Sequence, residues 1–107
     1  MKITRRPPAH LSPATRRWWS DIVKLFLFND RDLPLLTAAG EAWDRARQAR
    51  TILDKEGLTF SSPSGEIKRH PAIGIEHDSM GRYARFVREL RLDDLPAPDS
   101  RPPALRR

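Results

Sequence analysis

The sequence predicts a mainly α-helical protein in which two helices form a hairpin, a third helix follows, and a small β-hairpin separates the second helix from the third. Three observations support this fold class. Apolar residues recur at helical spacing in three segments. The second of these segments is rich in alanine. Two short β-prone stretches flank a Pro-Ser-Gly turn between the second and third segments.

The length of 107 residues favours one domain. We expect a flexible basic arm over residues 1–11, a helical oligomerisation domain over 12–92 and a flexible proline-rich tail over 93–107. The absence of cysteine excludes disulfides, thiolate zinc sites and a cysteine nucleophile. No stretch approaches the roughly 20 apolar residues that cross a bilayer, and the first residues do not form a signal peptide. A soluble intracellular protein without a membrane partner is therefore expected.

The net charge of +6 is concentrated near the start of the chain, where residues 1–28 hold six Lys/Arg and one acid. Such an excess favours a polyanion partner, although a solvated surface explains it equally well. Arg16 and Arg17 precede Trp18 and Trp19, a combination that suits phosphate contact and base stacking, but the spacing of the tryptophans fits a helix core better. The candidate DNA-binding residues are Lys2, Arg5, Arg6, Arg16 and Arg17.

The first helix is predicted over residues 13–27, because Ser12 is a good N-cap and Pro13 suits the first helical position. Its apolar face is too broad for one small core to cover easily. Either all of it packs within one chain, or part of it forms a subunit contact in a ring-shaped oligomer. The candidate oligomer interface consists of Trp19, Ile22, Val23 and Phe26.

The second helix is predicted to begin within residues 32–35 and to end at residue 56, before Gly57. Small residues dominate its apolar stripe and permit close approach to the first or third helix in an antiparallel hairpin. Its charged residues are expected on outward faces; they are Glu41, Asp44, Arg45, Arg47, Arg50 and Asp54.

A two-stranded hairpin is predicted over about residues 58–69, and it must rest on the helices or on a neighbouring subunit because an isolated hairpin is marginal in water. The third helix begins near Pro71. Its predicted buried stripe consists of Ile73, Met80, Tyr83, Ala84, Val87 and Leu90. Arg82, Arg85 and Arg88 could contact phosphates, but pairing with Asp78 and Glu89 on a solvent face explains them better.

No catalytic constellation emerges from the sequence. His10, His70 and His77 lack clustered carboxylates or thiols, so a solvated or capping role is favoured over a metal site. The serines of the turn have no base partner, and Gly65 alone does not make a phosphate-binding loop. We therefore predict a protein that is not an enzyme, with no catalytic residues, no metal and no cofactor.

The order of motifs resembles that of the phage terminase small subunit family over about residues 7–92. The matching segments are Leu11-Ser12-Pro13 with Trp18-Trp19, Asp32-Leu33, Ala39-Gly40-Glu41-Ala42-Trp43, Glu56-Gly57-Leu58, Ser64-Gly65 and His70-Pro71-Ala72. The resemblance implies a ring that binds double-stranded DNA and delivers it to the large terminase subunit, an ATPase and nuclease, in the cytoplasm of a bacterial host cell. It also implies no catalytic residues.

The resemblance further implies that the large subunit binds toward the tail, where Leu105 lies among Arg101, Arg106 and Arg107. Family members often have a longer basic segment or a separate helix-turn-helix before the region that this chain matches. Eleven residues precede the first helix here, which favours weak sequence preference, as in a gene-transfer-agent-like particle. Two alternatives stay open: a small helix-turn-helix regulator, and an adaptor that does not bind DNA.

Overall fold

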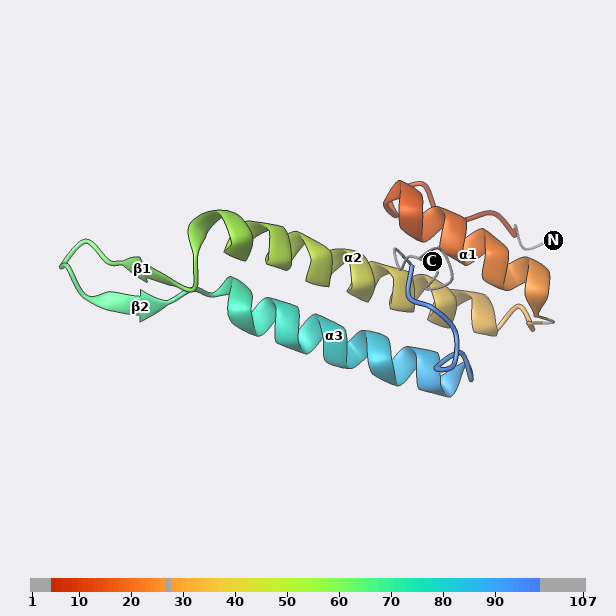
Figure 1. Ribbon diagram of the computed structural model, residues 1–107. Helices are drawn as coiled ribbons and strands as arrows, with labels where there is room; N and C mark the ends of the chain where they lie inside the picture. Colours follow the sequence, from red (N-terminus) through yellow and green to blue (C-terminus); the bar gives the residue numbers. More distant parts are fainter. Residues whose placement is uncertain (1–4, 27, 99–107) are drawn as a thin grey trace, which may run out of the picture.

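The computed structural model describes residues 5–26 and 28–98 and confirms a mainly helical fold with a small sheet between the second and third helices. Its elements are α1 (Pro13–Leu25), α2 (Asp32–Glu56), β1 (Thr59–Ser61), β2 (Ile67–Arg69) and α3 (Ala72–Glu89). Figure 1 shows α2 and α3 side by side, the sheet beyond one end of this pair, and α1 packed near the other end. We call residues 32–89 the long hairpin and residues 5–25 the α1 module.

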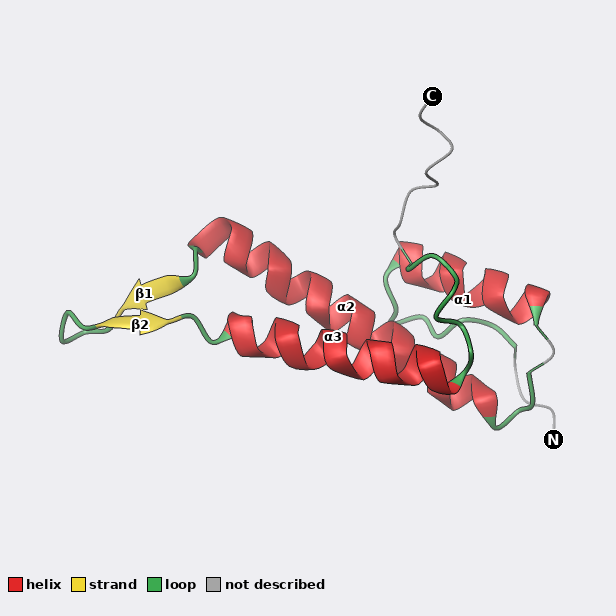
Figure 2. Cartoon of the chain, turned by 60° about the horizontal axis from the view of Figure 1, so that its bottom comes forward, coloured by secondary structure: helices red, strands yellow, loops and turns green. Residues whose placement is uncertain are grey.

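The α1 module begins as predicted. The Oγ of Ser12 accepts the N–H of Thr15 at 3.3 Å, and Pro13 follows in the first turn. The helix ends at Leu25, two residues before the predicted end, because Phe26 has an extended backbone with φ −124°. A short connection then leads into α2 (Figure 2).

The partner of α2 along its length is α3, whereas α1 packs against one end of the pair (Figure 2). Small residues make the close approach possible: Ala39, Ala42, Ala46 and Ala49 on α2 are buried, and Ser79 on α3 is 2% exposed. Met80, predicted in the buried stripe of α3, is 37% exposed, so that prediction is wrong. Ser79 is buried in its place because a small side chain fits between the closely packed α2 and α3, whereas Val87 and Leu90 of the same stripe are buried as predicted.

Two separate cores result from this arrangement. The larger core unites all three helices and includes Trp18, Trp19, Ile22, Leu36 and Val87. The smaller one lies toward the sheet and consists of Ala49, Leu53 and Ala72 with Ile73 against them. The sheet end of the long hairpin therefore buries much less apolar surface than the α1 end.

An aromatic cluster joins the three helices at the α1 end. The ring of Tyr83 on α3 lies 6.3 Å from that of Trp18 on α1 and 5.0 Å from that of Trp43 on α2. Both ring pairs are tilted, and both centroid separations lie in the range of interacting aromatic pairs. Trp18 and Trp19 are 7% and 2% exposed, which confirms that their spacing marks a helix core.

The β-hairpin is antiparallel and turns through Gly65, whose φ of +89° suits glycine. Sequence reasoning required this hairpin to rest on the helices or on a neighbour. In the single chain it projects past the ends of α2 and α3, and the residues of both strands are exposed (Figure 1). Among the described helices, none is long and apolar enough to cross a membrane.

Candidate nucleic-acid and subunit interfaces

Asp44 fixes the position of α1 on α2. Its carboxylate accepts the backbone N–H of Ser12 at 2.7 Å, the Ser12 hydroxyl at 2.9 Å and the Thr15 hydroxyl at 2.6 Å. A negative charge at a helix N-terminus is also favoured by the helix dipole. The prediction that Asp44 faces outward is therefore wrong, because it satisfies the free N-terminal groups of α1.

Gly40, one turn before Asp44, lets the two helices meet at this point. A Cβ atom built on Gly40 would lie 2.9 Å from Cγ2 of Thr15 and 3.4 Å from Cδ1 of Leu11. Thr15 and Leu11 are 0% and 2% exposed, so neither side chain has free space to move into. The Gly40 and Asp44 pair thus holds the α1 module in one orientation.

Two of the candidate DNA-binding residues are engaged within the chain. The guanidinium of Arg16 donates to the carbonyl oxygens of Ala9 and Leu11, which holds the arm against the start of α1. The guanidinium of Arg5 donates to the carbonyl oxygen of Phe28 at 3.0 Å and contacts Asp30 at 3.3 Å. These contacts tie the described part of the arm to the start of α1 and to the connection before α2, and the flexibility of the arm stays a prediction.

Arg6 and Arg17 are both exposed. They belong to the α1 module, which carries five Lys/Arg and one acid, whereas the long hairpin carries nine of each. The basic excess of the described chain therefore lies mainly in the α1 module. Lys2 lies outside the described residues, as do Arg101, Leu105, Arg106 and Arg107.

The four candidate interface residues of α1 differ in exposure. Trp19 and Ile22 are 2% and 4% exposed because the chain's own core covers them, and Nε1 of Trp19 donates to the hydroxyl of Thr37 at 3.1 Å. Val23 and Phe26 are half-buried against the same core. Leu25 recurs at helical spacing with these residues but is 72% exposed, and it was not among the candidate interface residues. Packing within one chain thus accounts for the burial of Trp19 and Ile22. A contact of Val23 and Phe26 with another subunit stays a prediction.

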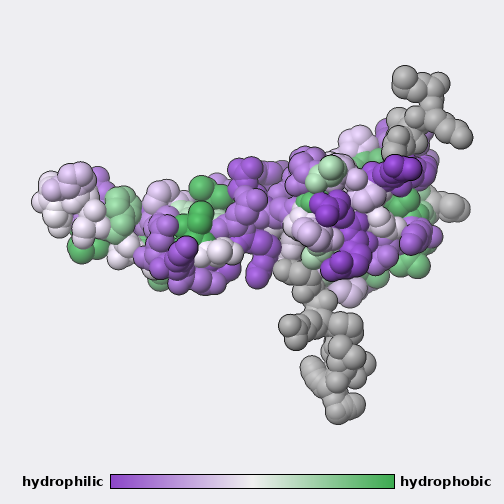
Figure 3. Space-filling view, turned by 90° about the horizontal axis from the view of Figure 1, so that it is seen from above, coloured by the Kyte–Doolittle hydropathy of each residue, from purple (hydrophilic) through white to green (hydrophobic). Residues whose placement is uncertain are grey.

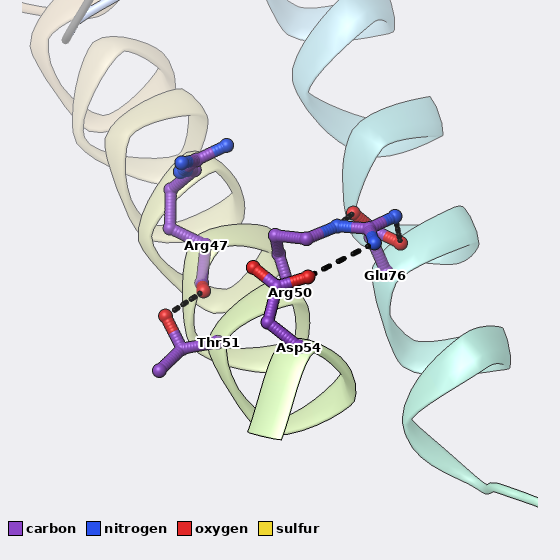
Figure 4. Close-up of polar contacts among 5 residues, drawn as sticks. All are labelled: Arg47, Arg50, Thr51, Asp54 and Glu76. Carbon is purple, nitrogen blue, oxygen red and sulfur yellow. Dashed lines mark hydrogen bonds and ion pairs between the residues drawn. The ribbon is translucent and has the colours of Figure 1, made fainter. Parts of the chain in front are cut away.

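Arg50 joins α2 to α3 near the sheet end (Figure 4). Its Nε and Nη2 donate to the two carboxylate oxygens of Glu76 at 2.9 and 2.8 Å, and Nη1 lies 3.5 Å from Asp54. The hydrogen bond with Glu76 and its negative charge raise the pKa of Arg50 above the usual value. Arg50 was predicted on an outward face, but it bridges the two helices where the apolar core is smallest.

His70 connects the sheet to both long helices. Its Nδ1 accepts the N–H of Ala72 at 3.0 Å, which caps α3, and its Nε2 lies 2.8 Å from a carboxylate oxygen of Glu56. The ring of Phe60 meets that of His70 edge-on at 6.2 Å. The capping role favoured from the sequence is confirmed for His70. Over residues 5–26 and 28–98, no group of three or more His, Asp or Glu side chains is placed to hold a metal ion.

Comparison with known proteins addresses the family directly. The family profile described as "Phage terminase, small subunit" matches residues 15–101, which is most of the chain. The chain belongs to the phage terminase small subunit family. No curated protein and no solved structure gave a significant match.

Membership confirms the resemblance predicted from the order of motifs and gives this terminase small subunit a role in phage DNA packaging. The family implies interaction with DNA and with a large terminase subunit, and its members are generally non-catalytic. The helix-turn-helix alternative also fits the structure poorly. α2 has 25 residues and is buried against α3 along one face, so it does not form the short, exposed recognition helix of that motif.

The start of the C-terminal segment packs against the core of this terminase small subunit. Leu92 is 3% exposed, and Leu95 packs against the larger core. Residues 95–98 and α1 together line a hollow of about 270 Å³, next to the exposed Leu25. Leu95 thus lies against the core and residues 95–98 lie beside α1, whereas the flexibility of the tail stays a prediction.

Proposed function

We propose that this chain acts, in the cytoplasm of a bacterial host, as an oligomeric small terminase subunit that selects viral or virus-like DNA and delivers it to the large terminase ATPase and nuclease. The family match over residues 15–101 carries this proposal. The subunit itself performs no catalysis, and it needs no metal or cofactor.

The DNA contact belongs to the α1 module and to the residues before it. The charge distribution supports this choice, because neutralising phosphates requires an excess of cations on one surface. Arg6 and Arg17 are the exposed contacts, together with Lys2, whereas Arg5 and Arg16 also hold the arm in place. Contacts of this kind bind the backbone without reading sequence, which suits weak sequence preference and a gene-transfer-agent-like particle.

The large-subunit contact belongs to the tail, at Arg101, Leu105, Arg106 and Arg107. The position of residues 95–98 supports this assignment, because these last described residues lie beside the exposed Leu25 and the hollow that it lines. Leu105 with its basic neighbours gives the large subunit an apolar anchor and charged groups.

The ring would be completed by α1 contacts near Val23 and Phe26. These two residues and Leu25 keep exposed apolar surface at the end of α1, whereas Trp19 and Ile22 support them from within the core. Light scattering of the full chain measures the assembly. A mass that stays at 12.3 kDa across micromolar concentrations would contradict the oligomer.

Deletion of residues 99–107 tests the delivery step. The cut falls after the packed segment, so the fold and the oligomer should be unchanged. Co-purification with the cognate large subunit should be lost, and the number of DNA-filled particles should fall. Replacing Lys55 and Arg69 by Gln controls for the loss of cations elsewhere. Unchanged association after the deletion would move the large-subunit contact to another surface.

A further inference from the structure

The chain turns back on itself directly after α3. The N–H of Leu92 donates to the carbonyl oxygen of Val87 at 2.7 Å. The N–H of Arg91 donates to the carbonyl oxygen of Arg88 at 3.1 Å. These two bonds form a Schellman motif, in which Arg91 takes the left-handed backbone, at φ +62°, that is usually taken by glycine. The turn sends the next residues back toward α1 (Figure 2).

The returning segment lies against α1, and we call residues 91–98 the strap. Leu92 is buried in the larger core, and Leu95 is half-buried against the same core. Residues 96–98 then form part of one wall of the hollow of about 270 Å³ whose other wall is α1. Proline fixes its own backbone φ, so this stretch loses less conformational entropy on docking than a flexible chain does. The strap is therefore held firmly at Leu92 and more loosely from Leu95 onward.

The face of α1 beside the strap carries a cation of the proposed DNA contact. Arg17 is exposed and lines the same hollow as residues 95–98. In Figure 3 strongly hydrophilic surface and apolar patches lie side by side at the end of the molecule that carries α1. The strap therefore borders the surface where phosphates would meet Arg17.

The strap also brings two carboxylates to this place. Asp93 and Asp94 lie between Leu92 and Leu95 in the sequence and are exposed. Within residues 5–26 and 28–98 neither carboxylate has an ion-pair partner. Exposed charges act over about 10 Å at moderate salt. Since Asp94 adjoins Leu95 at the wall of the hollow, the two carboxylates oppose the attraction of phosphates to Arg17.

We propose that the strap is an autoinhibitory cover of the α1 module. While the strap is docked, Asp93 and Asp94 weaken the binding of DNA by Arg17, and release of the strap strengthens that binding. The strap continues into residues 99–107, which the proposed function assigns to the large subunit. Because the strap beyond Leu92 is only partly buried, binding of the large subunit draws it off α1. This inference rests on the proposed function and couples its two contacts, so that the small subunit holds DNA firmly only when the motor is attached.

Neutralising the two carboxylates tests the role of their charge. In fluorescence anisotropy, Asp93→Asn with Asp94→Asn should tighten the binding of duplex DNA about fivefold at low salt, and the gain should shrink as salt rises. Glu66→Gln with Asp78→Asn removes two exposed carboxylates from the long hairpin and is the matched control. This control has the same net charge and should change the Kd less than about twofold. Equal gains in both pairs would show that only net charge acts, and the cover would be overturned.

Undocking the strap tests its position without changing the charge. Leu95→Ser removes the apolar contact with the core, so it should also tighten DNA binding. Leu95→Met keeps that contact and should bind DNA as the wild type does. Circular dichroism should show the same helix content in all three proteins, because Leu95 lies outside the helices. Wild-type affinity in Leu95→Ser would contradict the cover.

A fluorescent label reports the position of the strap without DNA. The chain has no cysteine, so Ala97→Cys gives a single site for bimane, a fluorophore that an indole quenches on contact. Ala97 and Trp18 line the same hollow, so the label should be quenched in the free subunit. Adding the cognate large subunit should raise its emission, whereas Trp18→Phe in the same background should be bright from the start. Quenching that persists in the complex would overturn the release.

The possible results separate this inference from the proposed function. A wild-type protein that binds DNA through Arg17, but gains no affinity from either the asparagine pair or Leu95→Ser, would keep the proposed DNA contact and overturn the cover. Absence of DNA binding by the wild type and by both variants at low salt would contradict the DNA contact and the cover together.

Discussion

The α1 module and the long hairpin are built on different chemistry. The α1 module is basic, and it docks on α2 and α3 through large apolar side chains and the carboxylate of Asp44. The long hairpin is balanced in charge, and its two helices contact each other through small residues and the bidentate Arg50–Glu76 pair. A surface with excess cations suits a polyanion, and a neutral surface with an exposed sheet suits another protein chain. The comparison therefore separates a basic, tightly docked region from a charge-balanced region that ends in an exposed sheet.

The largest expected effect comes from removing the anchor of the α1 module. Trp19→Ala should destabilise the protein by about 3–5 kcal/mol, because the indole is 2% exposed and its removal leaves a cavity. Denaturant unfolding measures this change. Asp21→Ala on the same helix is the control and should change stability by less than about 0.5 kcal/mol, since Asp21 is exposed. Equal losses in both variants would show that the core does not hold α1 in this orientation.

A smaller effect is expected at the polar contact between α1 and α2. Asp44→Ala removes three accepted hydrogen bonds and should cost about 1–3 kcal/mol in unfolding free energy. Ser12→Ala in the same background should then cost less than it does in the wild type, because the two residues share their contacts. Fully additive losses would contradict the contact.

The smallest effect is expected at the sheet end of the long hairpin. Glu76→Ala should lower the melting temperature less than Asp44→Ala does, and the loss should shrink at high salt, because Arg50 is partly exposed. Asp78→Ala, at an exposed neighbouring position of α3, is the matched control and should change little. Hydrogen exchange should show faster opening near Leu53 than near Leu36, and the reverse order would contradict the weaker core at this end.

Local signals in the sequence predicted most of the fold. Ser12-Pro13, Gly57 and the Pro-Ser-Gly turn set the limits of the elements, because capping and turn chemistry depend on neighbouring residues. The roles of Asp44 and Arg50 were missed, since which charged side chain reaches another helix depends on how the helices cross. The family followed from the order of motifs, and the spacing of the tryptophans predicted a helix core. That the core of a single chain covers Trp19 and Ile22, which were also candidate subunit contacts, required the packed structure.

The most direct test of the division between the two regions is the salt dependence of DNA binding. Arg6→Gln with Arg17→Gln removes two exposed cations from the α1 module, and Arg45→Gln with Lys55→Gln removes two exposed cations from the long hairpin. Fluorescence anisotropy with unrelated duplexes gives the slope of log Kobs against log salt. The first pair should weaken binding to all duplexes alike and reduce the slope by about 0.9 for each lost phosphate contact, whereas the second should leave both unchanged. Equal effects of the two pairs, or no DNA binding by the wild type at low salt, would contradict the account.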